Sequence, residues 1–287
     1  MPNLQVIYIA GFNLDGNTGR NNATRQKAEA LREVLGAGNF RLYYPKGSSI
    51  RPLSYLYALV FDVTLFFKLT GIDKGAVVIE RQTIIPLSNV LLRLKKIRMV
   101  YELHTDLKSE LPFLDKSWIG KKLTWLLIWS ERRNLTRSSG IIINSPSLKK
   151  LVAPYQKPTL CIYNGANTKD FFPRDQLECR RQLGLNSGYK YFLFSGMASK
   201  WHGIELLIQL FKEEALASKP DHVLLIVGLM KDEYSKSLRT LAENCANIQL
   251  IDFVPMQAVN TYINAADVCL LPVNNIRTNF SSPLKLY

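Results

Sequence analysis

The stretch that decides the fold is Asn247–Tyr287, NIQLIDFVPMQAVNTYINAADVCLLPVNNIRTNFSSPLKLY. Its apolar runs Ile248–Ile251 and Val268–Leu271 are short, rich in β-forming residues and unalternated, as expected of strands buried on both faces of a parallel sheet. Met256–Ala265 between them predicts a helix. This order places Pro272–Tyr287 beyond the carboxyl end of a strand, which is where open α/β sheets bind ligands.

The tail Pro272–Tyr287 has the composition of an anion site. It is rich in Asn, Ser and Pro, and it contains Arg277 and Lys285. We expect a helix to begin near Ser281–Leu284, and the free backbone N–H groups at the start of a helix attract phosphate. The tail therefore predicts half of an anion-binding site.

A loop that contains glycines joins the first predicted strand to the first predicted helix. The strand is Leu4–Ala10, and the helix runs from about Ala23 to Leu35. Glycines at such a junction let the backbone approach a ligand closely. Because the loop matches neither a P-loop nor a GxGxxG fingerprint, a plain polar loop remains the alternative. The three residues of interest are Gly16, Asn17 and Gly19.

Two later strands end in polar residues that one edge of a sheet would bring together. Val77–Glu80 is followed by Arg81, and Met99–Leu103 delivers Glu102 and His104. A histidine at the end of a strand either packs and forms hydrogen bonds within the fold or serves a site.

Three predicted helices of the first half display apolar and basic residues. Leu53–Leu69 is the most apolar segment. Asp62 interrupts it, and it is shorter than the ~20 residues of a spanning helix, so we expect a buried or interfacial helix. Leu87–Lys96 and Trp118–Thr136 interleave apolar residues with Lys and Arg. This pattern suits an anionic membrane surface or an ordinary solvated face.

The second half opens with a loop that resembles an anion cradle. The strand Tyr191–Ser195 leads into Gly196–Gly203, which contains Lys200 and His202, and the helix Ile204–Phe211 follows. Backbone N–H groups and the helix dipole favour negative charge at this position, and Lys200 adds a full positive charge.

The chain is expected to form two α/β domains, residues 1–173 and 174–287, because its 287 residues exceed one typical domain. Arg174–Leu185 predicts a helical connection between them. Residues 1–173 hold 25 Lys and Arg against 12 Asp and Glu, and residues 174–287 hold 12 against 11, within a formal net charge of +14. A positive field on one domain favours a membrane surface, an acidic or phosphorylated acceptor or nucleic acid, and a solvated basic face without a partner is the alternative.

The cysteines indicate a reducing compartment. Cys161, Cys179, Cys245 and Cys269 share no CxxC spacing, so the sequence suggests neither zinc nor disulfides. Leu4–Ala10 lacks the basic region that begins a signal peptide. We therefore expect a cytoplasmic protein, with a peripheral position on the inner face of the membrane as an option.

Two segments of the tail, ADVCLLPV (residues 266–273) and SSPLKLY (residues 281–287), resemble the nucleotide-binding domain of family 4 of the retaining glycosyltransferases. The resemblance covers most of the chain and implies the GT-B fold, with two Rossmann-like lobes. Members of this family continue with a Glu-x7-Glu pattern that holds the donor ribose. Phe280 stands at the first Glu and the chain given ends before the second. The resemblance therefore implies a second lobe that is incomplete, in a record truncated at its C-terminus.

The resemblance also implies roles for individual residues. His104 would lie beside the transferred sugar, as the catalytic residue. A nucleotide diphosphate sugar would be the donor, a glycan or lipid-linked molecule the acceptor, and no metal or other cofactor would be required, nor any nucleic acid. The donor would be held by Gly196, Lys200, His202, Ser282, Pro283, Leu284 and Lys285. The acceptor side would comprise Gly16, Asn17, Gly19, Arg81 and Glu102.

Three functional hypotheses follow. The first is a glycosyltransferase that transfers a sugar with retention in cell-surface polysaccharide assembly. The second is a non-catalytic module that binds a nucleotide sugar or a partner. The third is a GT-B epimerase acting on a nucleotide sugar. The nucleobase, the sugar, the acceptor and the oligomeric state are not specified by the sequence.

Overall fold

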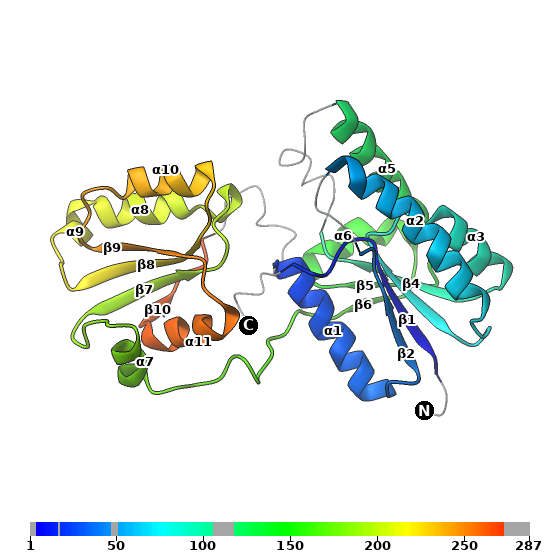
Figure 1. Cartoon of the computed structure of the whole chain (residues 1–287), viewed down its shortest axis with the longest axis horizontal. Helices are drawn as coiled ribbons and strands as arrows, with labels where there is room; N and C mark the ends of the chain where they lie inside the picture. The colour runs from blue at the N-terminus through cyan, green and yellow to red at the C-terminus, as the bar shows by residue number, and fades with distance from the viewer. Residues whose placement is uncertain (1–3, 17, 47–50, 106–117, 273–287) are drawn as a thin grey trace. The chain divides into compact units, whose positions relative to one another are not determined.

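The computed structural model describes residues 4–16, 18–46, 51–105 and 118–272 (Figure 1). These residues form two compact units, and the chain passes from one to the other between Asn164 and Gly165. The boundary expected from the sequence lay after residue 173. Residues just before that position already belong to the second unit: the Phe172 carbonyl accepts hydrogen bonds from Asn260 and Asn264, both at 3.1 Å.

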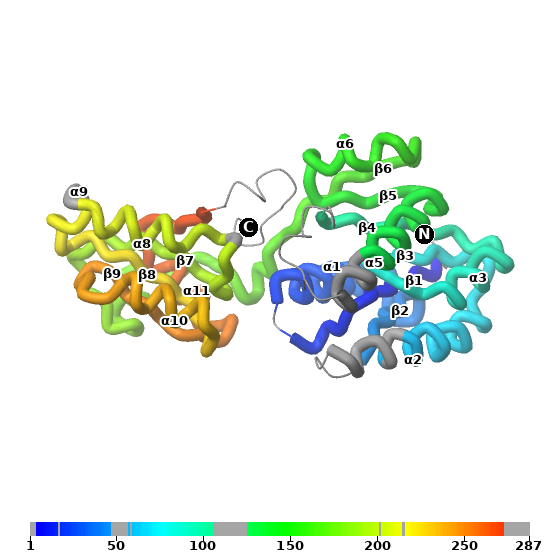
Figure 2. The backbone as a smooth tube through the Cα atoms, turned by 90° about the horizontal axis from the view of Figure 1, so that it is seen from above, coloured from blue at the N-terminus to red at the C-terminus, as the bar shows by residue number. Residues whose placement is uncertain are grey.

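The first unit is built on a sheet of six parallel strands in the order β2-β1-β3-β4-β5-β6 (Figure 2). The strand Phe40–Tyr43 was not predicted. It has only four residues and an exposed Arg41, so no apolar run marks it in the sequence. The strands are β1 (Val6–Ala10), β2 (Phe40–Tyr43), β3 (Val77–Arg81), β4 (Arg98–Leu103), β5 (Gly140–Ile143) and β6 (Thr159–Cys161).

Long helices cover the two faces of this sheet unequally. On one face α1 packs through Ala28 near Tyr8 and Ile79. On the other face α2 and α3 pack on Ile7, Ile9 and Val78, and α5 packs through Leu135 near Tyr101. The helices are α1 (Gly19–Leu35), α2 (Arg51–Thr70), α3 (Pro86–Leu94), α5 (Trp118–Arg137) and α6 (Lys149–Val152), with 3-10 turns at Pro146–Leu148 and Ala153–Tyr155.

Two helix boundaries differ from the prediction for identifiable reasons. Helix α1 begins at Gly19 because the Thr18 hydroxyl caps it, accepting from the N–H of Asn21 at 3.2 Å. We had expected Gly19 to lie in the loop, but it is the first residue of the helix. Helix α3 ends at Leu94 because Lys96 adopts a left-handed conformation with φ of 56°.

Asp62, the polar residue within the apolar run of α2, has a structural role. Its buried carboxylate accepts the backbone N–H groups of Leu87 and Ser88 at 2.9 and 3.0 Å, and thus caps the start of α3. This contact fixes α3 beside α2. Among the described residues, no helix is both long enough and apolar enough to cross a membrane.

The second unit has a sheet of four parallel strands in the order β10-β7-β8-β9. Here the prediction of strands buried on both faces was wrong for both apolar runs. In the first run only Ile248 is buried and Gln249 is exposed. In the second run only Val268 and Cys269 pair, and both are exposed. They form an edge of the described sheet. The strands are β7 (Lys190–Ser195), β8 (His222–Leu229), β9 (Ile248–Asp252) and β10 (Val268–Cys269).

Helices of the second unit match the predicted ones more closely. The Asp232 side chain caps α10 by accepting from the N–H of Ser235 at 2.7 Å. The short α9 was not predicted, and α7 is shorter than the expected Arg174–Leu185. The elements are α7 (Gln176–Gln182), a 3-10 turn (Lys200–His202), α8 (Ile204–Lys212), α9 (Glu214–Ala217), α10 (Glu233–Leu241) and α11 (Met256–Ala265).

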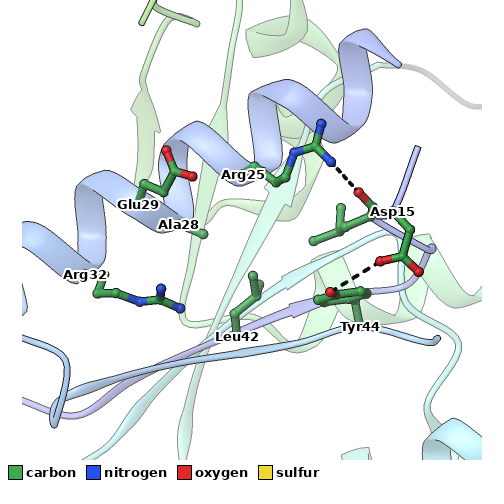
Figure 3. Close-up of a pocket in the computed structure, with 8 residues that line it drawn as sticks. Asp15, Arg25, Ala28, Glu29, Arg32, Leu42 and Tyr44 are labelled. Carbon is green, nitrogen blue, oxygen red and sulfur yellow. Dashed lines mark hydrogen bonds between the residues drawn. The ribbon is translucent and has the colours of Figure 1, made fainter. Parts of the chain in front are cut away.

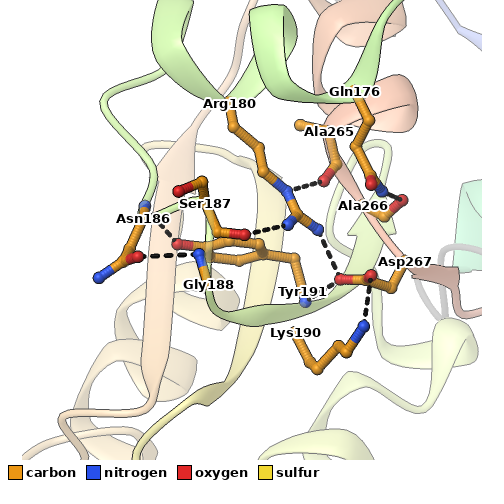
Figure 4. A network of polar contacts seen from close by, with 10 residues as sticks. All are labelled: Gln176, Arg180, Asn186, Ser187, Gly188, Lys190, Tyr191, Ala265, Ala266 and Asp267. Carbon is orange, nitrogen blue, oxygen red and sulfur yellow. Dashed lines mark hydrogen bonds and ion pairs between the residues drawn. The ribbon is translucent and has the colours of Figure 1, made fainter.

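A buried arginine fixes the amino-terminal edge of the second sheet (Figure 4). Arg180 of α7 forms an ion pair with Asp267 at 2.6 Å and donates to the carbonyls of Ala265 and Ser187, both at 2.9 Å. Asp267 also accepts from the N–H of Tyr191 at 2.7 Å. This network satisfies polar groups within the fold and leaves the opposite, carboxyl edge as the place for ligands.

Candidate functional site

The strand orders locate the ligand-binding edge of each sheet. In the first unit the direction of the order reverses between β1 and β3, and in the second it reverses between β7 and β10. Ligands of open α/β sheets bind outside the carboxyl ends of strands at such reversals. The loops after β1, β3 and β7 are therefore the first candidates.

At the reversal of the first sheet the backbone is closely packed. The Gly11 N–H donates to the Arg81 carbonyl at 2.9 Å. A Cβ atom on Gly11 would lie 1.8 Å from the Gln82 carbonyl oxygen, so no side chain fits there. The loops that follow β1 and β3 thus begin in direct contact with each other.

Three predicted residues, Arg81, Glu102 and His104, meet in one cluster on the α1 face of this sheet. Glu102 is its centre, and its side chain is only 2% exposed. The carboxylate accepts a hydrogen bond from the Tyr8 hydroxyl, pairs with Lys27 Nζ at 2.5 Å and contacts His104 Nε2. We refer to these five residues as the Glu102 cluster.

Electrostatics keep Glu102 ionised. Burial alone would raise its pKa, but the hydrogen bond with His104 and the positive charges of Lys27 and Arg81 hold the pKa of Glu102 well below its usual range. Burial and the charge of Arg81 lower the pKa of His104 to about 4. At neutral pH the cluster therefore pairs a carboxylate with a neutral imidazole.

Both ring nitrogens of His104 have partners within the unit. Asn144 Nδ2 donates to Nδ1 at 3.1 Å, so the single ring proton is on Nε2, facing Glu102. The Lys27 Nζ lies 3.2 Å from the same Nε2. The sequence gave no signal for Lys27, because α1 brings it from 75 positions away. Asn144 was recognisable only as the end of a strand.

Arg81 is positioned by the first helix and the first loop. It is buried, and its Nη1 donates to the Thr24 hydroxyl at 2.6 Å. Its guanidinium lies 5.4 Å from the centre of the Phe12 ring, whereas that of Arg20 lies 4.0 Å from the same ring. Arg81 therefore links the loop after β1 to the Glu102 cluster.

The opposite face of the sheet holds a second polar network, which was not predicted. The Thr83 hydroxyl donates to Glu80 at 2.6 Å, and Asn134 Nδ2 donates to the same oxygen at 3.2 Å. Ser130 donates to the Thr83 carbonyl at 2.8 Å. Burial raises the pKa of Glu80 to about 7. This network joins α5 to the end of β3.

The loop after β1 opens onto a cavity of about 420 Å³ between α1 and β2 (Figure 3). Two guanidinium groups, two carboxylates and a phenol surround an apolar floor. Arg25 also fixes the loop by donating to the Leu14 carbonyl at 2.7 Å. Gly16 is exposed, and its carbonyl accepts from Asn21 Nδ2 at 3.0 Å. The lining residues are Leu14, Asp15, Arg25, Ala28, Glu29, Arg32, Leu42 and Tyr44.

In the second unit the loop after β7 has the backbone geometry of a close approach. Gly196 has φ of +126° and Gly203 has φ of +66°, conformations that L side chains rarely adopt. Gly203 precedes α8, and no side chain caps that helix start. Lys200 is exposed, whereas the His202 ring lies 5.5 Å from the ring of Phe194. The loop therefore presents a helix start and one exposed cation at the carboxyl edge.

The remaining predicted residues cannot be placed. Asn17, Ser282, Pro283, Leu284 and Lys285 lie outside the described residues. Within the described part of the chain, no group of three or more His, Cys, Asp or Glu side chains is arranged to hold a metal ion.

Three exposed apolar side chains at the carboxyl edge of the second sheet were also not predicted. Met197 follows β7, Met230 follows β8 and Phe253 follows β9, and all three are exposed. Exposed apolar side chains at a ligand-binding edge can pack on a flat ring. Their position after each strand was the only signal in the sequence.

The second unit is similar to one known protein family. The model of a family described as Glycosyl transferases group 1 matches residues 175–281. The matched range contains the loop Gly196–Gly203 and α8. No curated protein matches this chain.

Solved structures extend the likeness to both units. Sucrose-phosphate synthase from Thermosynechococcus elongatus has a TM-score of 0.67 at 17% identity, over 95% of this chain and 77% of that one. WaaG, a glycosyltransferase of lipopolysaccharide biosynthesis, has a TM-score of 0.63 at 14% identity, over 93% of this chain and 75% of that one. Starch synthase IV from Arabidopsis thaliana, bound to ADP and acarbose, has a TM-score of 0.66 at 11% identity, over 96% of this chain and 80% of that one. These likenesses confirm the GT-B fold, with two Rossmann-like lobes.

Proposed function

We propose that the protein transfers a sugar from a nucleotide diphosphate sugar to a glycan or lipid-linked acceptor, with retention of the anomeric configuration. The observation that supports this most is the group 1 match, since it contains the uncapped start of α8 and Lys200 at the carboxyl edge of the sheet. A role in assembling cell-surface polysaccharide is part of the proposal.

The donor diphosphate would be stabilised by fixed positive charge. Glycosyl transfer releases a diphosphate while positive charge develops on the sugar ring, so oriented donors matter more than a strong base. The N–H groups at the start of α8 and the Lys200 ammonium are of this kind. Gly196 and His202 would shape the same loop, and Ser282–Lys285 would complete it. We propose that these groups offset the diphosphate charge without a metal ion.

In the first unit we propose that His104 contacts the transferred sugar. Glu102, Arg81 and Asn144 act as positioning residues, because they fix the ring and its tautomer. The cavity beside Gly16 offers carboxylates, guanidinium groups and the Tyr44 ring for the acceptor. Hydroxyl groups of sugars bind such a mixture of donors and acceptors, so a saccharide portion fits this cavity.

The positive charge of residues 1–173 favours contact with an anionic membrane surface. We propose that a lipid-linked acceptor is presented there, which would place the protein on the inner face of the membrane.

A non-catalytic binding module is the second candidate. One observation favours it: both ring nitrogens of His104 already have partners within the unit, as in a purely structural histidine. Such a module would bind a nucleotide sugar through the second unit and show no turnover.

Transfer and release assayed with a panel of nucleotide diphosphate sugars distinguish the two. We expect turnover of one donor, with the product anomer identified by NMR. We expect His104→Ala to lower kcat by about 10- to 100-fold and to leave the Kd for the nucleoside diphosphate unchanged. His222→Ala is the matched control, since His222 lies at the start of β8 and pairs with Asp221. A His104→Ala variant with full activity would remove His104 from the site, and binding without any turnover would favour the module.

A further inference from the structure

We propose that the first unit docks on an anionic lipid bilayer through the outer face of α2, α3 and α5. The inference deepens the membrane contact named under the proposed function and rests on that part of it, because it assigns the interaction surface and the chemistry of its partner. It depends on exposed side chains and charges of these three helices, and not on the donor site.

Helix α3 presents an apolar stripe to solvent. Leu87, Val90 and Leu94 are spaced i, i+3 and i+7, which places them on one side of a helix. All three are exposed, and Leu94 is 77% exposed. The sheet-facing side of the same helix is already filled by the buried Ser88 and Leu92.

Helix α2 has the same organisation. Val60, Val63 and Phe67 share one side and are exposed, with Phe67 at 68%. The opposite side faces the sheet through the buried Leu65 and Leu69. The apolar residues of α2 therefore exceed what the core of the unit can bury.

Helix α5 adds aromatic side chains to this surface. Trp125, Leu126 and Trp129 are exposed, and Trp125 is 64% exposed. Tryptophan is enriched at membrane interfaces, where its ring has an apolar body and a polar N–H group.

The three stripes belong to one surface because the helices contact one another. Asp62 of α2 caps α3 as described above. Asn89 Nδ2 of α3 donates to Asn134 Oδ1 of α5 at 3.4 Å. The labelled helices cover the same face of the first sheet in Figures 1 and 2. Monomeric soluble proteins rarely expose large contiguous apolar patches without a partner.

The same helices carry arginines for which the described residues provide no acidic partner. Arg93 of α3 and Arg133 of α5 are close enough to lower, together with burial, the pKa of Arg137. None of the three forms an ion pair with a described acidic residue. The acidic residues of these helices are Asp62 and Glu131, and both are buried.

The combination selects the partner. An apolar face with tryptophans, exposed arginines and no exposed carboxylate on the described part of its three helices complements a surface that is apolar inside and negative outside. An anionic bilayer has both properties. The proposed occupant is therefore a bilayer that contains an anionic phospholipid.

The test is flotation of the whole chain with vesicles of phosphatidylcholine alone or mixed with phosphatidylglycerol. We expect binding to the mixed vesicles that weakens at high salt, and a blue shift of tryptophan fluorescence. Arg137→Ala should weaken binding about fivefold. The double variant Val90→Glu and Leu94→Glu should weaken it at least tenfold. The control is Val34→Glu, since Val34 is 84% exposed on α1, on the other face of the sheet.

Three outcomes would overturn the proposal. The first is that the wild-type chain fails to float with the mixed vesicles. The second is equal loss of binding in Val34→Glu. The third is that the wild-type chain self-associates in sedimentation equilibrium and that the double variant Val90→Glu and Leu94→Glu does not. The surface would then bind a second copy of the chain. Circular dichroism checks that each variant is folded. Nucleotide-sugar turnover in solution is measured separately, so the docking surface can fail while the proposed sugar transfer holds, and the reverse.

Discussion

At the scale of single residues, the first unit contains two buried carboxylates in opposite states. Glu102 is surrounded by Lys27, Arg81 and His104 and stays ionised. The donors beside Glu80, which include Thr83 and Asn134, are neutral, so burial dominates and raises its pKa to about 7. Successive strands thus present one carboxylate to each face of the sheet, and the charge of the neighbours decides the protonation of each.

The state of Glu80 predicts a pH dependence of stability. Its pKa is raised from 4.5 to about 7, so the folded protein holds more protons than the unfolded chain in this range, and stability falls as the pH rises through it. Glu80→Gln removes this loss. We expect the variant to match the wild type near pH 4.5 and to be more stable by about 3 kcal/mol above pH 7.

Urea unfolding across this pH range measures the difference. The lowered pKa of His104 makes stability rise between pH 4 and 6.5, but it does so in both proteins and cancels. The control is Glu29→Gln, at an exposed glutamate of α1. The difference in unfolding free energy between this variant and the wild type should not change with pH. A difference in unfolding free energy between Glu80→Gln and the wild type that is the same at every pH would contradict the raised pKa of Glu80.

The sequence predicted part of this residue chemistry and could not predict the rest. Strand periodicity placed Arg81, Glu102 and His104 at neighbouring strand ends, and the structure brings them together. Lys27 joins them from α1, and nothing local in the sequence marks a lysine that a distant strand will contact. The state of Glu80 could not be predicted either, because it depends on how deeply α5 buries it.

At the scale of elements, glycines allow neighbouring strands and loops to approach closely at the carboxyl edge of each sheet. Gly228 lies in β8 where the pairing with β9 shifts register, and it has φ of +115°. A Cβ atom on Gly228 would lie 2.5 Å from the Gly196 carbonyl oxygen. The end of β8 therefore supports the backbone from which the loop after β7 departs.

Gly228→Ala should consequently destabilise the second unit. The added methyl group overlaps the Gly196 backbone and a strained φ is imposed, so we expect a loss of about 2–4 kcal/mol in the free energy of unfolding. Gly188→Ala is the control, because its Cβ would meet only the Asn186 side chain at 3.5 Å. Equal unfolding curves for the two variants in urea would show that the close approach does not matter.

Element boundaries were predictable where a cap or a turn is local. Thr18 is such a cap, but the sequence pattern favoured a start near Ala23, so the predicted start of α1 was late. The strand Phe40–Tyr43 and the exposed Val268–Cys269 were misjudged because their environment is set by position at the edge of a sheet, and not by their own residues.

At the scale of the whole molecule, the two units differ in charge and in the tasks that we propose for them. The first has the excess of Lys and Arg, the Glu102 cluster and the surface of α2, α3 and α5. The second has a nearly balanced charge and the group 1 match. The alternation of strands and helices in the sequence was sufficient to predict two α/β units, because each apolar run is short and each helix lies between two of them.

The central claim is that the carboxyl edge of the second sheet binds the diphosphate of a nucleotide through the start of α8 and Lys200. The most direct measurement is isothermal titration calorimetry of a panel of nucleoside diphosphates against the wild type, Lys200→Ala and the control Lys219→Ala, an exposed lysine that precedes β8. We predict that one nucleoside diphosphate binds, that Lys200→Ala weakens it by about 1–3 kcal/mol through loss of a charge-assisted hydrogen bond, and that Lys219→Ala does not. Equal affinity in all three proteins, or binding of no nucleoside diphosphate, would contradict the claim.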